Sequence, residues 1–406
     1  MNTITDKLKY ELNFLFVLIY CLSSIQFFKP VLISSSLSYS IYYFAFFLSI
    51  LIVVLRYKIS YYNSITFPIL LILISQILSI FSSVYSWNQN LSDSIKATLP
   101  YMGYVLFFLL LVLRIKSSNA EKLIIILGCL YIILYLISFL IYPKIIIIFS
   151  ETYTDERGFQ RIIINGFGFL FLFSFFSLNK YLTRYNFLWL IVYIITCAFV
   201  VMTLTRTLIT VSFILSLLYL LRKANAFHKI IAILIFGSSF YILPNFEFYK
   251  SLVAETTSET AYIKDNIRLQ AFNYYINDFS PNPVAKLFGN GQPYKDTEYA
   301  KYVNYLEKGL GLYASDIGYA GFYVKFGVLA ILAYVILIYQ IIRIKVVDDY
   351  LYCKYFLYFT FIISLIIEAP FNSSFIISIM IACYILSINA KQNLLPNVSV
   401  RKYKIA

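Results

Sequence analysis

The sequence has little charge, almost no histidine and few residues that break helices. Only 13% of its 406 residues are charged, whereas soluble domains carry roughly 25%. It contains 1 histidine, 13 glycines and 10 prolines. The shortage of charge excludes an ordinary soluble domain as the bulk of the chain. The single histidine excludes a metal site built on a histidine pair.

Several motifs of soluble enzymes are also missing. The sequence has neither a glycine-rich phosphate loop ending in Lys-Ser/Thr nor a Gly-x-Ser-x-Gly turn. The 5 cysteines lie in or beside apolar runs, so neither a disulfide framework nor a metal cluster is expected. The predicted outer loops lack an Asp-x-Asp pair, which disfavours a metal-bridged sugar nucleotide. We therefore expect no metal and no cofactor.

Apolar runs of about 20 residues, enough to cross a bilayer as a helix, recur from end to end. Residues in lipid must pair their own backbone groups, so these runs are expected to be helices. The predicted fold class is all-α: a polytopic helical integral membrane protein with about 12 transmembrane helices. The expected spans are 12–28, 37–55, 65–84, 97–113, 122–141, 161–178, 185–202, 205–221, 230–243, 317–341, 352–367 and 374–388.

The net charge of +14 could indicate a nucleic-acid partner, but the cations cluster in alternate connectors. That pattern follows the positive-inside rule and predicts a membrane protein with both termini in the cytoplasm. Residues 1–244 then hold nine spans and an outer loop near 142–160, and 317–406 hold three spans and a basic tail. Between them, 245–316 form one large extracytoplasmic loop.

The large loop is expected to be partly helical. Apolar residues recur near a 3.6-residue period over 257–279, which predicts a helix. Pro281 and Pro283 are expected to stop it. Gly289 and Gly291 flank Asn290, and this pattern predicts a tight turn where backbone can approach a ligand closely.

Two arginines are the first catalytic candidates. Arg206 lies at the outer joint between the seventh and eighth predicted spans, where a guanidinium can bind phosphate through paired hydrogen bonds. The alternative is an arginine that anchors the helix end at the membrane surface. Arg268 lies in the predicted loop helix, and its alternative is a surface ion pair with Asp265.

Arg157 and Arg161 precede the sixth predicted span and are candidate substrate-binding residues. Their alternative is a solvated loop in which an arginine pairs with Asp155 or Glu156. The residues alone do not decide between Arg157 and Arg161.

Three charged residues lie near the last predicted spans. Asp316 opens the tenth span and could deprotonate a sugar hydroxyl, although an N-cap is the common alternative for such an aspartate. Lys325 lies deeper in that span and Glu368 ends the next. Both are functional candidates as ionisable residues in a membrane, and they could instead pair with each other. The only histidine, His228, is expected in a solvated cytoplasmic connector.

In the order and sidedness of these pieces, the chain resembles the bacterial O-antigen polymerase family (Wzy), which is related to the O-antigen ligases. The architecture matches over most of the length. The motifs match from Arg157 to Gly168, at Thr205-Arg206, and in the loop from Arg268 through Asn282-Pro283 to Gly289-Asn290-Gly291. Asp316, Tyr319 and Gly327 match the family's next span.

The resemblance implies a glycosyltransferase that moves a growing glycan from undecaprenyl pyrophosphate onto a lipid-linked repeat unit at the outer face of the membrane. It implies Arg206, Arg268 and Asp316 as catalytic residues. It also implies substrate-binding roles for Arg157, Gly289, Gly291 and Tyr319, to which the reasoning from the residues adds Arg161 and Lys325 as substrate-binding candidates. The implied partners are the lipid-linked oligosaccharide and the bilayer, with no nucleic acid; a chain-length regulator protein is left open.

Two alternatives use the same kind of substrate. Ligases usually have a histidine where the tenth span begins, and this sequence has Asp316 there, which favours polymerase over ligase. A flippase or transporter would need a cationic cavity and has little use for a loop of this length. The sugars, and the choice between O-antigen and capsule, do not follow from the sequence.

Overall fold

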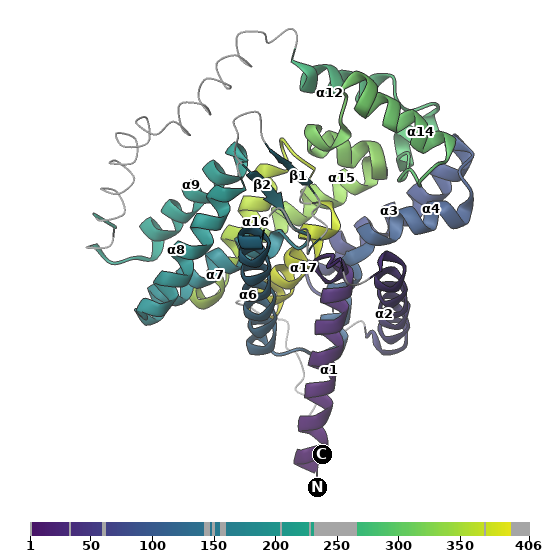
Figure 1. Cartoon of the computed structure of the whole chain (residues 1–406). Coiled ribbons are helices and arrows are strands. Elements are labelled where there is room, and N and C mark those ends of the chain that lie inside the picture. The colour runs from purple at the N-terminus through teal and green to yellow at the C-terminus, as the bar shows by residue number, and fades with distance from the viewer. Residues whose placement is uncertain are drawn as a thin grey trace.

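The computed structural model describes residues 2–31, 34–58, 62–141, 147, 151–154, 160–203, 205–226, 229–230, 266–368 and 371–390. Arg157, His228, Asp265 and nearly all of the predicted ninth span lie outside these residues. Figure 1 shows the described elements as a bundle of helices with the helices of the large loop gathered at one end.

The first nine helices lie in or beside the first eight predicted spans. They are α1 (Asn2–Ser24), α2 (Ser35–Arg56), α3 (Thr66–Trp87), α4 (Leu91–Thr98), α5 (Val105–Leu113), α6 (Ser117–Ile141), α7 (Gly168–Arg184), α8 (Phe187–Met202) and α9 (Arg206–Lys223). The 3₁₀ segment η3 (Leu99–Tyr104) joins α4 to α5.

The elements of the predicted large loop and of the last predicted spans follow. The predicted loop holds α12 (Ile267–Asn277), α13 (Pro283–Phe288), α14 (Glu298–Asn304), the π-helical turn η6 (Tyr305–Gly309) and the 3₁₀ turn η7 (Ala314–Ile317). The remaining elements are α15 (Tyr319–Arg343), η8 (Asp348–Tyr350), α16 (Leu351–Ile363) and α17 (Ser373–Ile388).

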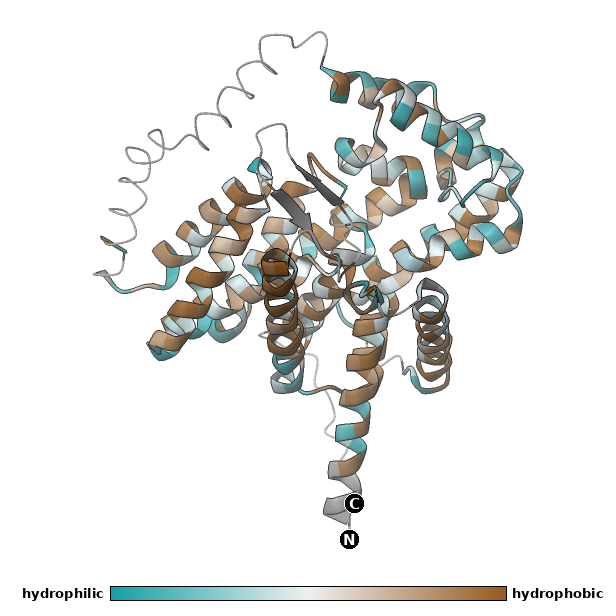
Figure 2. Cartoon of the chain, viewed as in Figure 1, coloured by the Kyte–Doolittle hydropathy of each residue, from teal (hydrophilic) through white to brown (hydrophobic). Residues whose placement is uncertain are grey.

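Within the described residues, 5 helices are long and apolar enough to cross a membrane. The structure is therefore that of a helical protein with membrane-spanning segments, and the total of twelve spans stays a prediction. Figure 2 shows apolar residues along the bundle helices and more hydrophilic ones on the loop helices. The five helices are Ser36–Arg56, Thr66–Trp87, Leu91–Leu113, Ser117–Ile141 and Tyr319–Arg343.

The sixth predicted span is wrong at its start. Helix α7 begins at Gly168, and Arg161 lies instead in strand β2 (Gln160–Ile163), which pairs antiparallel with β1 (Glu151–Thr154). The β-branched Ile162 and Ile163 suit a strand better than a helix start. This hairpin is a small departure from the expected all-α fold.

The predicted loop helix over 257–279 is confirmed from 267 to 277, and its first part, 257–265, lies outside the described residues. Helix α12 begins after Asn266, whose side chain accepts a hydrogen bond from the backbone N–H of Arg268. It ends at Asn277, before either proline. Pro283 then begins α13, because proline needs no N–H partner at the first position of a helix.

Two buried cores hold these elements together. The larger one joins the helices of the bundle, and the smaller one joins the loop helices to the N-terminal half of α15. Tyr275, Phe279 and Tyr299 from the loop pack in the smaller core with Val324 of α15. The loop is thus fastened to a membrane helix by apolar packing, and the candidate site lies at that junction.

Candidate functional site

Helix α15 is interrupted at Gly327, which has φ 80° and ψ −176°. A break of this kind deprives the preceding carbonyls of their helical N–H partners. The loop supplies replacements. The Val324 carbonyl accepts hydrogen bonds from the backbone N–H (2.8 Å) and Nδ2 (2.9 Å) of Asn290, and the Lys325 carbonyl accepts one from the N–H of Gly291 (2.9 Å). The interrupted helix is therefore stable because the loop is docked on it.

The glycines at this contact are required by its closeness. A Cβ added to Gly289 (φ 88°) would lie 2.4 Å from the Lys325 carbonyl oxygen, and one on Gly327 would lie 2.3 Å from that of Leu287. A Cβ on Gly291 would lie 2.9 Å from the Ser79 carbonyl oxygen of α3. The predicted close approach is thus made to the protein's own helices. A substrate-binding role for Gly289 and Gly291 stays a prediction.

Asn290 anchors the turn to the end of α3. Its side chain is fully buried; Oδ1 accepts a hydrogen bond from Trp87 Nε1 (2.9 Å) and Nδ2 donates to Ser280 Oγ (3.0 Å). The Trp87 ring stacks on Tyr299 with a centroid distance of 4.5 Å. The sequence analysis did not single out Trp87. Its rarity, as one of only 2 tryptophans, and its position just after an apolar run could have indicated it.

Beside this turn, Lys325 of α15 forms a buried ion pair with Glu368, which follows α16 in the chain. Lys325 Nζ lies 2.6 Å and 2.5 Å from the two carboxylate oxygens of Glu368, and the two side chains are only 17% and 5% exposed. The backbone N–H of Glu368 donates to the Ser315 carbonyl (2.8 Å), which ties this residue to the loop exit. The pairing considered from sequence is confirmed.

A second interrupted helix meets the ion pair. The chain from α4 to α5 passes through η3, where Pro100 lies in the first turn and Met102 departs from helical geometry. Tyr101 in this segment presents its ring 5.8 Å from Lys325 Nζ, at the distance of a cation–π contact. Gln76 Nε2 of α3 donates to the Tyr101 carbonyl (2.9 Å) and replaces a helical hydrogen bond there.

Glu307 in the π-helical turn is a further charged residue of this site, and the sequence analysis missed it. Burial raises the pKa of its carboxyl, nearby Lys325 opposes the rise, and the negative charges of Glu368 and Asp316 add to it. These four residues form one electrostatic network. In sequence, Glu307 is one of several acidic residues beside a lysine, so the pattern carried no clear signal.

Other predicted residues lie apart from the break. Arg206 is the half-buried first residue of α9, and Arg268 is an exposed residue in the first turn of α12. These helices lie on different sides of the molecule in Figure 1. Tyr319 donates from its hydroxyl to the Phe361 carbonyl (3.1 Å). The catalytic roles of Arg206 and Arg268 and the substrate-binding role of Tyr319 stay predictions.

Asp316 does not have the capping role considered for it. It lies inside the 3₁₀ turn η7, and Gly318 occupies the N-cap of α15 with φ 52°. A Cβ on Gly318 would lie 2.2 Å from the Ser364 carbonyl oxygen, so the chain can reach α15 here only through glycine. Asp316 is thereby left half-exposed at the loop exit, and its catalytic role stays a prediction.

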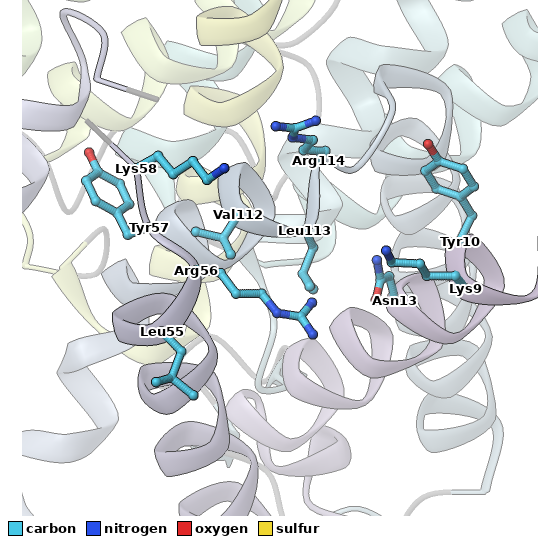
Figure 3. A pocket seen from close by; sticks show the side chains of 10 residues that line it. All are labelled: Lys9, Tyr10, Asn13, Leu55, Arg56, Tyr57, Lys58, Val112, Leu113 and Arg114. Carbon is cyan, nitrogen blue, oxygen red and sulfur yellow. The ribbon is translucent and has the colours of Figure 1, made fainter. Parts of the chain in front are cut away.

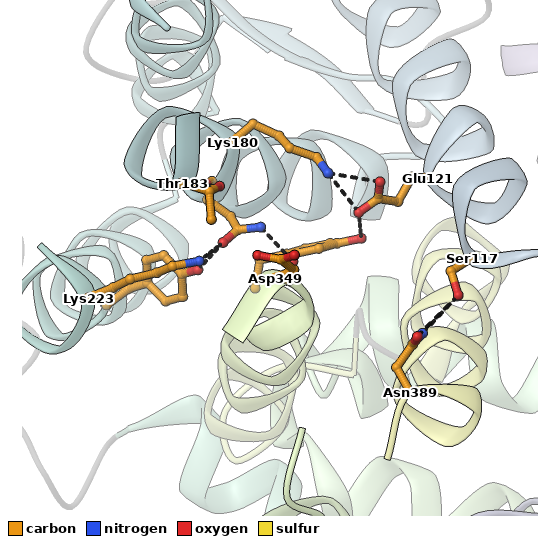
Figure 4. Close-up of polar contacts among 10 residues, drawn as sticks. Ser117, Glu121, Lys180, Thr183, Lys223, Asp349 and Asn389 are labelled. Atoms are coloured by element: carbon orange, nitrogen blue, oxygen red, sulfur yellow. Dashed lines mark hydrogen bonds and ion pairs between the residues drawn. The ribbon is translucent and has the colours of Figure 1, made fainter. Parts of the chain in front are cut away.

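A second polar cluster lies at the ends of α6, α7, α9 and α16 (Figure 4). Lys180 Nζ is 2.8 Å from a Glu121 oxygen. Asn179 donates to the Asp349 carbonyl (2.7 Å) and accepts from the Tyr219 hydroxyl (2.6 Å) and from Lys223 Nζ. These donors and acceptors satisfy one another across four helices, so the cluster is best explained as a fastening of the bundle.

Fold and site together define a helical protein with membrane-spanning segments, in which the chain from α12 to η7 is docked on an interrupted helix beside a buried Lys–Glu pair. Comparisons with family models, curated proteins and solved structures found no match to this chain. The functional argument therefore rests on the residues themselves.

Proposed function

We propose that this protein is a polysaccharide polymerase that transfers a growing glycan from undecaprenyl pyrophosphate onto a lipid-linked repeat unit at the outer face of the bacterial cytoplasmic membrane. The observation that carries the proposal is the docking of the large loop over the break in α15, beside the buried pair of Lys325 and Glu368. An intramembrane ion pair at a break in a helix is costly to build and is typical of functional sites.

The chemistry of this transfer fits the charges near the break. The acceptor hydroxyl oxygen forms a new bond to the anomeric carbon of the donor, and the bond from that carbon to the pyrophosphate oxygen breaks. The hydroxyl proton passes to a carboxylate. Glu307 suits that step because its pKa is raised, which makes a carboxylate a better base. Asp316 is the other candidate.

The leaving pyrophosphate carries the developing negative charge, which cations can stabilise. Lys325 lies at the break, and Arg206, Arg268, Arg157 and Arg161 are the further candidates from the sequence. An arginine is the preferred partner of the pyrophosphate because a guanidinium binds phosphate oxygens in pairs. Arg206 and Arg268 are alternative candidates for this role, since their helices lie on different sides of the molecule. The raised pKa of Glu307 and the buried position of Lys325 support a site that excludes much of the water.

A flippase for the same lipid-linked oligosaccharides is the second candidate. It is favoured by the two interrupted segments, η3 and the break at Gly327, which meet beside Lys325. Paired broken helices commonly form the ligand site of transporters. A ligase-type transferase remains a third reading of the same substrate chemistry, disfavoured by Asp316 at the position where ligases usually have histidine.

Chain-length analysis of the glycan tests the proposal. We expect Arg206→Ala and Arg268→Ala to leave the protein in the membrane at its normal level and to yield only single-repeat glycans. Arg222→Ala, near the other end of helix α9, is the matched control and should keep the full distribution of glycan chain lengths. Wild-type chain length in both test variants would refute the proposal.

Cells that lack the protein separate the alternatives. Loss of a polymerase leaves single lipid-linked repeats on the outer leaflet, whereas loss of a flippase traps them on the inner leaflet. Loss of a ligase leaves long lipid-linked polymer that is not attached to its acceptor. A purified assay with a defined lipid-linked repeat then tests the reaction directly.

A further inference from the structure

A cavity of about 460 Å³ lies where the start of α1 and the ends of α2 and α5 meet. It is far along the chain from the loop site and takes no part in the function proposed above. Figure 3 shows Lys9 and Arg56 extending from α1 and α2 toward the same space. Residues from three helices thus enclose one basic recess.

The charged side chains described at this cavity are all positive. Of the ten lining residues within the described part of the chain, four are cationic and none is an aspartate or glutamate. Two of the cations end helices: Arg56 is the last residue of α2, and Arg114 directly follows α5. A cluster of cations in a recess raises the local concentration of anions. The cationic lining residues are Lys9, Arg56, Lys58 and Arg114.

Apolar surface continues directly from the cavity. Leu55 lines it and is 74% exposed, and the adjacent Val54 is 71% exposed. Both belong to one of the helices long and apolar enough to cross a membrane. The recess therefore lies at the boundary where a hydrocarbon-facing helix surface ends and cations begin.

We propose that this cavity binds the phosphate headgroup of an anionic phospholipid, whose acyl chains lie along the exposed apolar face of α2. The guanidinium of Arg56 can bind phosphate oxygens in pairs, and Lys9 and Lys58 add point charges. Asn13 adds an amide that can hydrogen-bond to the glycerol portion. Basic pockets between membrane helices are suited to lipid headgroups, and the contiguous apolar surface favours a lipid over free phosphate.

Lipid binding to the purified full chain tests this site. Native mass spectrometry from detergent would measure retention of phosphatidylglycerol, phosphatidylethanolamine and, separately, inorganic phosphate. We expect phosphatidylglycerol to bind best and Arg56→Gln/Lys58→Gln to weaken it by roughly tenfold to thirtyfold, as expected for two cations near an anionic headgroup. The control Arg343→Gln/Lys345→Gln removes equal charge at the end of α15 and should change binding less than twofold.

Three results would overturn the site. The first is equal binding of phosphatidylethanolamine and phosphatidylglycerol. The second is an equal loss of lipid binding in the test and control variants. The third is binding of inorganic phosphate as strong as the binding of lipid. The last result would assign the cavity to a free anion. Arg56 and Lys58 are exposed, so folding should survive their substitution, and Lys9→Gln provides an independent variant on α1. Chain-length activity is not the readout, so failure here is distinct from failure of the polymerase proposal.

Discussion

The buried pair of Lys325 and Glu368 provides the sharpest test of how the site is built. Replacing Lys325 with methionine keeps the length of the side chain and removes its charge. Glu368, only 5% exposed, would then be a buried carboxylate without its partner. Removing one member of such a pair costs about 3–5 kcal/mol. Replacing both members with apolar residues of similar size is expected to cost far less, because no uncompensated charge remains.

A double-mutant cycle measures this difference. The free energy of unfolding is determined in lipid bicelles for Lys325→Met, Glu368→Leu and the double variant, and we expect a coupling of at least about 3 kcal/mol. Lys301 and Glu298 form the matched control: their atoms are 2.7 Å apart, but the side chains are 62% and 86% exposed. A solvated pair should show almost no coupling.

The outcome of the cycle separates structure from function. If the pair only fastens α15 to the chain after α16, the stable double variant should keep its activity. If the pair takes part in the site, the double variant should recover stability and still produce no polymer. A coupling no larger than that of the Lys301–Glu298 control would refute the reasoning, since burial would then have made no difference.

Three further predictions concern the docked loop. Gly289→Ala should destabilise the protein by more than about 3 kcal/mol, because it combines a positive φ with the close contact of its added Cβ. The control Gly311→Ala, whose added Cβ has no neighbour nearer than 3.6 Å, should cost only about 1–3 kcal/mol for its positive φ. Equal losses of thermal stability in the two variants would contradict the role of the close contact. Asn290→Ala should cost about 2–3 kcal/mol and increase hydrogen exchange at the backbone N–H of Gly291; unchanged exchange would disprove the anchoring role. Burial raises the pKa of the Glu307 carboxyl from 4.5, so the folded state holds that proton more tightly and the free energy of unfolding falls as pH rises above about 4.5. Glu307→Gln should flatten this fall. An unchanged pH profile of unfolding in that variant would contradict the role given to Glu307.

The pattern of apolar runs predicted most of the helices correctly because the rule behind it is local. A backbone in lipid must pair its own polar groups, so a long apolar run becomes a helix whatever its neighbours are. Helices α2, α3, α6 and α15 therefore agree with their predicted spans to within a few residues, except that α6 begins at Ser117 rather than at 122. The failure at Arg161 arose where strand pairing decided the conformation instead.

The site was only partly predictable for the opposite reason. The sequence singled out Lys325, Glu368 and the Gly289-Asn290-Gly291 turn as separate features. It could not show that the turn supplies hydrogen bonds to Val324 and Lys325, because those contacts join residues that lie 34 positions apart. Glu307 and Trp87 were missed for the same reason, since each matters only through the residues that the fold places beside it.

By itself, then, the sequence determined that this is a helical protein with membrane-spanning segments, one long polar stretch and basic residues between its apolar runs. Composition, run length and charge placement suffice for that, because the free energy of transferring a segment from water into lipid depends on the residues of that segment alone. Only the tertiary structure decided that the loop is docked on an interrupted helix, that Lys325 is neutralised by Glu368, and that cations from three helices enclose one cavity. Each of these depends on distances between segments remote in sequence, and packing alone sets those distances.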